Sequence, residues 1–144
     1  MAQQEQSLKN HTRWDPAFHF FLLPVSLLIV IATIVQAVRE PGWYSAAHVV
    51  VAIWATVAIF KIRLYALKVQ ERVIRLEERL RLKDLAPASL QGRIGDLSED
   101  QCVGLRFASD AEVVDLAQRA LASNWNRKQI KEAIRNWRPD NWRV

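Results

Sequence analysis

The chain has few of the residues that build covalent or catalytic chemistry. It contains one cysteine, Cys102, in 144 residues. An internal disulfide and a cysteine-built metal or iron–sulfur site are therefore excluded, because each needs at least two thiolates from one chain. The sequence also lacks a nucleophile elbow, a phosphate-binding loop, metal-ligand spacing and paired carboxylates within its apolar runs. We expect no enzyme activity and no cofactor.

Asp, Glu, Lys and Arg are absent from two long apolar runs, residues 16–38 and 43–60. At about 1.5 Å per residue, each run forms a helix of roughly 27 to 33 Å, which matches the hydrocarbon thickness of a bilayer. The sequence therefore predicts an all-α membrane protein with a two-helix transmembrane hairpin over residues 16–60. A cleaved signal peptide is the alternative for the first run. The long polar segment before it, the length of its apolar core and the second run directly after it favour a retained span.

The first span has a clear start and an expected bend. Asp15 is a suitable N-cap, and Pro16 fits the first helical position, where its missing N–H costs nothing. Pro24 removes a donor to the carbonyl of Phe20 and should bend the helix. The link of four residues, 39–42, is so short that the two helices should run antiparallel and adjacent.

Glycine and proline are missing between residues 44 and 86, and the residues after the second run are mostly good helix formers. We therefore expect the second span to continue without a break as a cytoplasmic stalk over residues 61–86, until Pro87 stops it. Oppositely charged residues at helical spacing are expected to form ion pairs along this stalk. These are Glu71 with Arg75 and Glu77 with Arg81.

Apolar residues follow one another along the stalk at alternating spacings of three and four, which is the a/d pattern of a coiled coil. The full set is Ile59, Ile62, Ala66, Val69, Val73, Leu76 and Leu80. A second set, Phe60, Leu67 and Ile74, repeats every seven residues on another face. We predict that Ile62, Val69, Val73, Leu76 and Leu80 form an oligomer or docking stripe. The alternative is that this chain's own C-terminal residues cover both faces.

After a loop over residues 87–97, the C-terminal region 98–144 has the pattern of three short helices. Ser98 with Gln101 and Ser109 with Glu112 have the spacing of capping boxes, and Asn126 is a suitable N-cap for the third helix. We expect that last helix to end at Trp137. It would place four apolar residues, Ile130, Ala133, Ile134 and Trp137, on one face.

Basic residues flank the apolar runs unequally. Lys9 and Arg13 precede the first run, whereas the link between the runs offers one arginine. Residues 61–84, which follow the second run, carry eight Lys or Arg against four Asp or Glu. By the positive-inside rule, the protein is expected to be multi-pass, with both termini cytoplasmic and residues 1–15 forming the cytoplasmic N-terminal segment.

His19 and His48 are the only ionisable groups within the apolar runs, and such groups are functional candidates. Together with Gln36 they could line a transport or redox path across an oligomer. Within one antiparallel hairpin, however, the two histidines would differ in depth by roughly 20 Å, so they cannot share one metal or haem. The alternative for each is an interfacial histidine that contacts headgroups, water or a neighbouring helix.

Two polar clusters are candidates for contacts with lipid headgroups or a partner. They comprise His11, Arg13 and Trp14 before the first span, and Arg127, Lys128, Lys131 and Arg135 near the C-terminus. The mixture of tryptophan and basic residues near the C-terminus would also suit nucleic acid. However, the helix-turn-helix pattern of residues 110–137 lacks the usual glycine, so nucleic acid is not an expected partner. The other alternative is that these tryptophans form the core of a small helical unit.

Four stretches carry a resemblance to a known family: NHTRWDPAFHFFLLP, KVQERVIRLEERLRL, GLRFASDAEV and KQIKEAIRNWRPDNWRV. Through them the chain resembles an uncharacterised family of small bacterial two-span membrane proteins. The resemblance implies a bacterial inner-membrane protein with a cytoplasmic helical C-terminal region. It implies no activity, ligand or site residue.

These features together predict a non-enzymatic integral membrane protein that acts as a self-associating scaffold or accessory subunit and presents a cytoplasmic helical docking surface. The expected partners are membrane lipids, further copies of the chain and a larger membrane complex. The alternatives are a transport or redox subunit that uses the intramembrane histidines and, third, a membrane-tethered nucleic-acid-binding protein.

Overall fold

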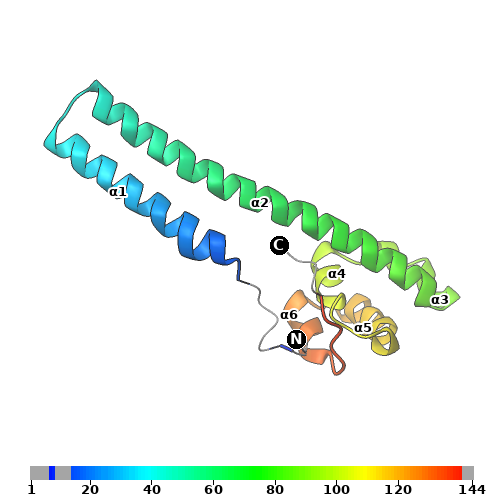
Figure 1. Cartoon of the computed structure of the whole chain (residues 1–144). Helices are drawn as coiled ribbons and strands as arrows, with labels where there is room; N and C mark the ends of the chain where they lie inside the picture. The colour runs from blue at the N-terminus through cyan, green and yellow to red at the C-terminus, as the bar shows by residue number, and fades with distance from the viewer. Residues whose placement is uncertain (1–6, 9–13, 141–144) are drawn as a thin grey trace. The chain divides into compact units, whose positions relative to one another are not determined.

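The computed structural model describes residues 7–8 and 14–140, and this part of the chain is helical, with no strand (Figure 1). The expectation of an all-α protein is confirmed for these residues. A single isolated antiparallel bridge joins Ala108 to Trp137. The elements are η1 (Ala17–Leu22), α1 (Leu23–Arg39), α2 (Trp43–Leu85), α3 (Ala88–Gln91), η2 (Ile94–Asp96), α4 (Glu99–Leu105), α5 (Asp110–Ser123) and α6 (Arg127–Ala133).

The contacts within the chain divide it into two compact units, and the division falls inside α2. Trp14–Leu67 form one unit, which we call the apolar unit. The described residues from Lys68 onward belong to the other, which we call the C-terminal unit.

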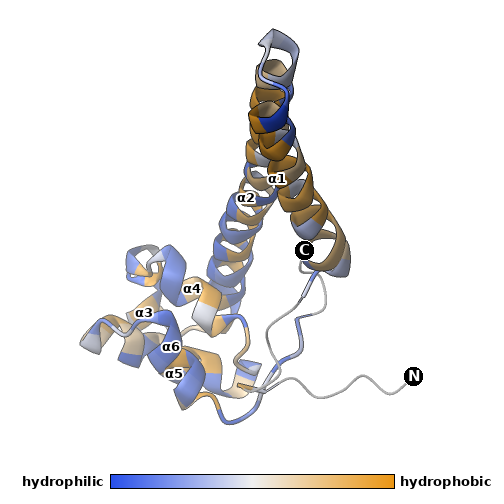
Figure 2. Ribbon diagram, turned by 90° about the vertical axis from the view of Figure 1, so that its left-hand side faces the viewer, coloured by the Kyte–Doolittle hydropathy of each residue, from blue (hydrophilic) through white to orange (hydrophobic). Residues whose placement is uncertain are grey.

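Among the described residues, two helices are long and apolar enough to cross a membrane, and the apolar unit contains the first and the beginning of the second. One comprises η1 and α1, Ala17–Arg39, and the other begins at Trp43. Hydrophobic residues colour α1 and the first part of α2 almost continuously in Figure 2. Only 6% of the residues in the most apolar window of each helix are buried. A soluble protein rarely leaves so large a contiguous apolar surface uncovered.

The first helix begins with a wide turn. Asp15 acts as its N-cap, as predicted, since the N–H of Phe18 donates to Asp15 Oδ1 at 3.2 Å. Residues Ala17–Leu22 then form a π-helix, in which the N–H of Leu23 reaches back to the carbonyl of Phe18. Because α1 proper starts only at Leu23, Pro24 lies in its first turn, where a missing N–H is tolerated. A π-helix ends just before Pro24, and the bend expected at this residue stays a prediction.

Contacts join the two apolar helices where the first begins. The guanidinium of Arg63 donates to Asp15 Oδ2 at 2.9 Å and lies 5.3 Å from the ring centroid of Phe18. The rings of Phe18 and Phe60 meet edge to face, 5.9 Å apart. At the other end, the hydroxyl of Ser45 donates to the carbonyls of Glu40 and Gly42 and so fixes the start of α2.

An open groove of about 270 Å³ lies between α1 and α2. It is apolar although two hydroxyl groups line it, because Ser26 donates to the carbonyl of Leu23 and Thr56 donates to that of Ala52. The other lining residues are Leu23, Leu27, Val30, Ile53, Val57 and Phe60.

Helix α2 continues without interruption over 43 residues and ends two residues before Pro87, as the absence of glycine and proline predicts. The segment 87–97, expected to be a loop, contains two short helical elements, α3 and η2. Their side chains Leu90 and Ile94 are buried in the core of the C-terminal unit. The segment is therefore part of the packed unit.

The core of the C-terminal unit draws apolar side chains from α2, α4, α5 and α6. Its largest fully buried members include Leu82, Leu105, Phe107, Val113 and Ile130. Helix α4 approaches α6 closely at Gly104, where a Cβ would lie 3.1 Å from both Cβ and Cγ2 of Ile130. This glycine lets the two helices pack against each other.

In the C-terminal unit, two of the three predicted helix caps form. Ser98 and Gln101 make a full capping box, and Asn126 caps α6 in a second box with Gln129. Ser109 precedes α5, but its buried hydroxyl has no hydrogen-bond partner among the described residues. The capping box with Glu112 is absent because that carboxylate accepts the backbone N–H groups of residues 135 and 136 instead.

The prediction that the last helix reaches Trp137 is wrong, because α6 ends at Ala133. Ile134 has an extended backbone, and the chain then runs beside residues 107–109. The N–H of Ser109 donates to the carbonyl of Asn136, and the N–H of Arg138 donates to that of Phe107 at 2.7 Å. These bonds satisfy backbone groups that a longer helix would have used internally. Trp137 still reaches the core, where its ring lies 5.3 Å from that of Phe107.

Candidate functional site

One face of α2 is covered by the C-terminal unit. Ile74, Glu78 and Leu82 are buried on this face, at a spacing of four residues, and Leu82 is part of the core. Beside them, Arg79 donates to the carbonyls of Gly95 and Leu97. This part of α2 is therefore a structural element of the C-terminal unit.

The opposite face of α2 is left uncovered by the described residues. Val69, Val73, Leu76 and Leu80, which we call the apolar stripe, are each between 47% and 61% exposed. Ile62, which belongs to the same pattern in the apolar unit, is 70% exposed. At about 100° per residue, the stripe lies roughly opposite Ile74, Glu78 and Leu82. The described C-terminal residues thus cover one of the two apolar faces of the stalk and leave the other free.

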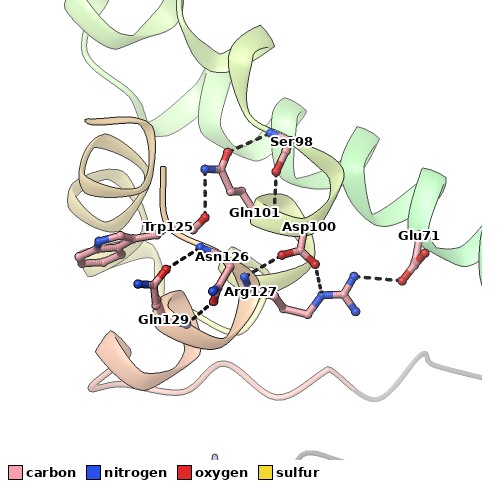
Figure 3. A network of polar contacts seen from close by, with 8 residues as sticks. All are labelled: Glu71, Ser98, Asp100, Gln101, Trp125, Asn126, Arg127 and Gln129. Carbon is pink, nitrogen blue, oxygen red and sulfur yellow. Dashed lines mark hydrogen bonds and ion pairs between the residues drawn. The ribbon is translucent and has the colours of Figure 1, made fainter. Parts of the chain in front are cut away.

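A polar network holds the C-terminal helices to α2 and to one another (Figure 3). Arg127 at the start of α6 donates through Nε to Asp100 Oδ1 at 2.8 Å and through Nη2 to Glu71 Oε1 at 3.1 Å. Gln101 donates to the carbonyls of Ala120 and Trp125, both at 3.1 Å. The network therefore ties α2, α4, α5 and α6 into one unit.

A second polar cluster surrounds Glu78, a buried residue of which 4% is exposed. Arg81 donates to Glu78 Oε2 at 3.0 Å, to Asp110 Oδ1 at 2.7 Å and to the carbonyl of Ala108 at 2.8 Å. Arg138 lies 3.6 Å from Glu78 Oε1. Burial raises the pKa of Glu78 above its ordinary value, although the guanidinium groups of Arg81 and Arg138 act in the opposite direction.

The raised pKa of Glu78 predicts a specific pH dependence of stability. Between the ordinary glutamate pKa of about 4.3 and the raised value, the folded protein binds more protons at this group than the unfolded protein does. The contribution of Glu78 to the free energy of unfolding must therefore fall as the pH rises through this window. Denaturation of the full chain in lipid nanodiscs, followed by hydrogen exchange of α5, should show this slope. The slope should be smaller in Glu78→Gln, and an unchanged slope would contradict the assignment.

The two predicted ion pairs within the stalk do not form, and their members pair with other helices or, for Arg81, also with Glu78 on the same helix. Glu71 contacts Arg127, and Arg75 lies 3.9 Å from Glu99. Arg81 contacts Glu78 and Asp110, so it does not use Glu77. Spacing along α2 correctly predicted that Glu71, Arg75 and Arg81 form ion pairs, but it predicted the wrong partners. Charged groups on the packed helices lie close enough to replace the partner one turn away on α2.

The basic residues expected to contact headgroups or a partner have different roles within the structure. Arg127 is engaged in the network of Figure 3. Lys131 lies 5.0 Å from the ring centroid of Phe107, whereas Lys128 is exposed and near Glu132. Arg135 is exposed, and its backbone N–H donates to Glu112.

In the first polar cluster, Trp14 is exposed. It makes an edge contact with the ring of His19. His11 and Arg13 lie outside the described residues.

The structure does not bring the three polar candidates of the apolar runs, His19, His48 and Gln36, together in one site. His19 belongs to η1, where its Nδ1 lies 2.8 Å from the carbonyl of Asp15. His48 is exposed in the second turn of α2, and Gln36 is exposed near the end of α1. Among the described residues, no group of three or more His, Cys, Asp or Glu side chains is placed to hold a metal ion.

Cys102 is fully buried, and burial raises the pKa of its thiol. A buried thiol with a raised pKa is a poor nucleophile. It therefore belongs to the core of the C-terminal unit.

Sequence reasoning missed the buried polar residues Glu78, Arg81 and Gln101 as organising groups. Glu78 lies four residues from both Ile74 and Leu82, so its position on a covered face could have been inferred from spacing. The partners of Gln101 could not have been inferred from spacing, because the carbonyls that it contacts are 19 and 24 residues away.

Comparisons with known proteins agree with the resemblance noted from the sequence in that both point to an uncharacterised family. No curated protein and no solved structure matches the chain. A family described as "Family of unknown function (DUF6526)" matches residues 1–144, the whole length of the sequence. The protein therefore belongs to the DUF6526 family.

Proposed function

We propose that this protein is a non-enzymatic integral membrane protein that associates with itself and presents its C-terminal unit as a docking surface. The apolar stripe of α2 carries the proposal. It has coiled-coil spacing, it is exposed, and the described part of its own C-terminal unit packs on the other side of the helix. Four apolar side chains along one face of the charged part of α2 need a partner to leave water.

The membrane assignment is supported by the two apolar helices and by their exposed side chains. The proposed location is the bacterial inner membrane, with residues 16–38 and 43–60 as an antiparallel hairpin and both termini in the cytoplasm. The contacts of Arg63 with Asp15 and of Phe18 with Phe60 are compatible with such a hairpin. The excess of basic residues that follows the second span supports the orientation.

Replacing both Val69 and Val73 by aspartate should abolish self-association, because four carboxylates would face one another in a dimer. Native mass spectrometry of the full chain, extracted from its membrane in nanodiscs, measures the result. The wild type should give an oligomer and the double variant a monomer. Lys68→Asp is the control, because it adds a carboxylate to the same helix outside the stripe and should leave the oligomer intact.

The same measurement can contradict the proposal. A monomeric wild type, or an oligomer that keeps its mass in the double variant, would overturn self-association through this stripe. A co-purifying foreign protein in place of a second copy would instead make the chain an accessory subunit of a larger complex.

A further inference from the structure

We propose that two copies of the chain pair through the apolar stripe as a parallel, in-register coiled coil in which Arg72 of each copy faces Glu77 of the other. This inference rests on the proposed self-association and adds its partner, direction and register. It follows from where the charged residues that flank the stripe lie and from which of them the C-terminal unit already uses.

The heptad assignment follows from the spacing of the stripe. Val73 and Leu80 are a positions, and Val69 and Leu76 are d positions. The flanking g positions are then Arg72 and Arg79, and the flanking e positions are Gln70, Glu77 and Asp84. Both g residues are therefore basic, and the two charged e residues, Glu77 and Asp84, are acidic.

The direction of pairing follows from these charges. In a parallel pair, a g residue faces the e residue five positions later in the other chain, so that Arg72 meets Glu77 and Arg79 meets Asp84. In an antiparallel pair, g faces g and e faces e, so that arginine would meet arginine and carboxylate would meet carboxylate. Opposite charges attract only in the parallel arrangement, and like charges penalise the other.

Of the two possible interchain pairs, the C-terminal unit engages the arginine of one, Arg79, and leaves Arg72 and Glu77 available. Arg79 donates to the carbonyls of Gly95 and Leu97, so its guanidinium is committed within its own chain. Arg72 and Glu77 are exposed, and neither forms an ion pair with the described residues. The interchain contact is therefore assigned to Arg72 and Glu77, which occur twice in a symmetric pair.

The short length of the stripe is consistent with pairing inside a membrane. The stripe spans less than two heptads, and so short a coiled coil is marginal in dilute solution, because helix pairing must offset the loss of chain freedom. Two copies that insert in the same orientation are already confined to one surface and already parallel. This confinement raises their effective concentration and reduces the cost of association.

Disulfide cross-linking of the full chain in lipid vesicles tests the direction and register. Val69→Cys and Leu80→Cys, made separately, should each give a cross-linked dimer, because parallel in-register helices place identical positions opposite each other. An antiparallel pair can bring at most one of these positions to its own copy. Lys68→Cys, exposed on another side of α2, is the control and should give little dimer. The native Cys102 is buried and should contribute none.

Charge reversal tests the ion pair. Arg72→Glu and Glu77→Arg should each weaken the dimer by roughly tenfold, because two attractions become two repulsions. A mixture of the two variants should form the mixed dimer, in which Arg72 of one chain again meets Glu77 of the other and the two introduced residues meet as an opposite pair. Each chain carries a distinct tag, so native mass spectrometry separates the mixed dimer from the two unmixed ones.

The outcomes separate this inference from the proposed self-association. A wild-type dimer that cross-links at both positions and recovers in the mixed pair supports the inference. A wild-type dimer that cross-links at neither position, or at only one, overturns the parallel register while self-association stands. A dimer that ignores both charge reversals overturns the ion pair. A wild-type monomer overturns both proposals.

Discussion

Replacing Arg81 by alanine is expected to lower the free energy of unfolding of the C-terminal unit by about 3–5 kcal/mol. The guanidinium of Arg81 joins three groups from different segments: Glu78 on α2, Asp110 on α5 and the carbonyl of Ala108 between α4 and α5. Its removal would leave the buried carboxylate of Glu78 with one basic partner in the described part of the chain, Arg138 at 3.6 Å. Most of the loss therefore comes from a buried charge without sufficient compensation.

The measurement is hydrogen exchange of α5 in the full chain, held in nanodiscs, as denaturant is added. Arg119→Ala is the matched control, because Arg119 contacts the exposed Asp115 on the same helix and such pairs contribute about 0–1 kcal/mol. A variant that also changes Glu78 to Gln should recover part of the stability lost in Arg81→Ala, since it removes the orphaned charge. Equal effects of Arg81→Ala and Arg119→Ala would show that the Glu78 cluster does not hold the unit together.

Gly104→Val is the second substitution with a large expected effect, about 1–3 kcal/mol of destabilisation or more. A Cβ at this position would lie 3.1 Å from two side-chain atoms of Ile130 and 3.4 Å from the carbonyl oxygen of Arg127. Ile130 is fully buried, so it has little room to move. The two additional methyl groups of valine would push α4 and α6 apart. Gly104→Ala should cost less, because the better helix propensity of alanine offsets part of the clash.

The effect is measured as the denaturant midpoint of the full chain, followed by exchange of the α4 and α6 amides. Gly92→Val serves as the matched control, because nothing lies within 4 Å of its Cβ position and its backbone is right-handed. Its midpoint should stay near that of the wild type. If the two valine variants behaved alike, the close approach of α4 to α6 would not matter for stability.

The sequence predicted those elements that depend on local chemistry. The long helix α2 follows from the absence of glycine and proline, and the box of Ser98 with Gln101 follows from residue types three positions apart. The end of α6 did not follow, because residues 134–138 leave the helix to pair with the backbone of residues 107–109. That choice depends on a segment about 30 residues away, which no local pattern reveals.

The spacing of apolar residues predicted the apolar faces of the stalk. It did not predict which face the C-terminal helices cover. Spacing identified two apolar faces on the stalk and left open how many of them the C-terminal helices would cover. The burial of Ile74 and the exposure of Val69 and Val73 distinguish the two faces. This distinction needs the positions of α4, α5 and α6, which are fixed by side chains such as Gln101 and Arg127.

The π-helix at the start of the chain's first apolar helix has a consequence for counting positions. A π turn holds one residue more than an α turn, so every residue before Leu23 is shifted in phase relative to those after it. A helical wheel drawn through both segments would place Asp15 and His19 on the wrong side. Deleting one residue between Phe18 and Leu22 would restore a regular helix, but it would turn Asp15 away from Arg63. With the π turn in place, Asp15 contacts Arg63 at 2.9 Å.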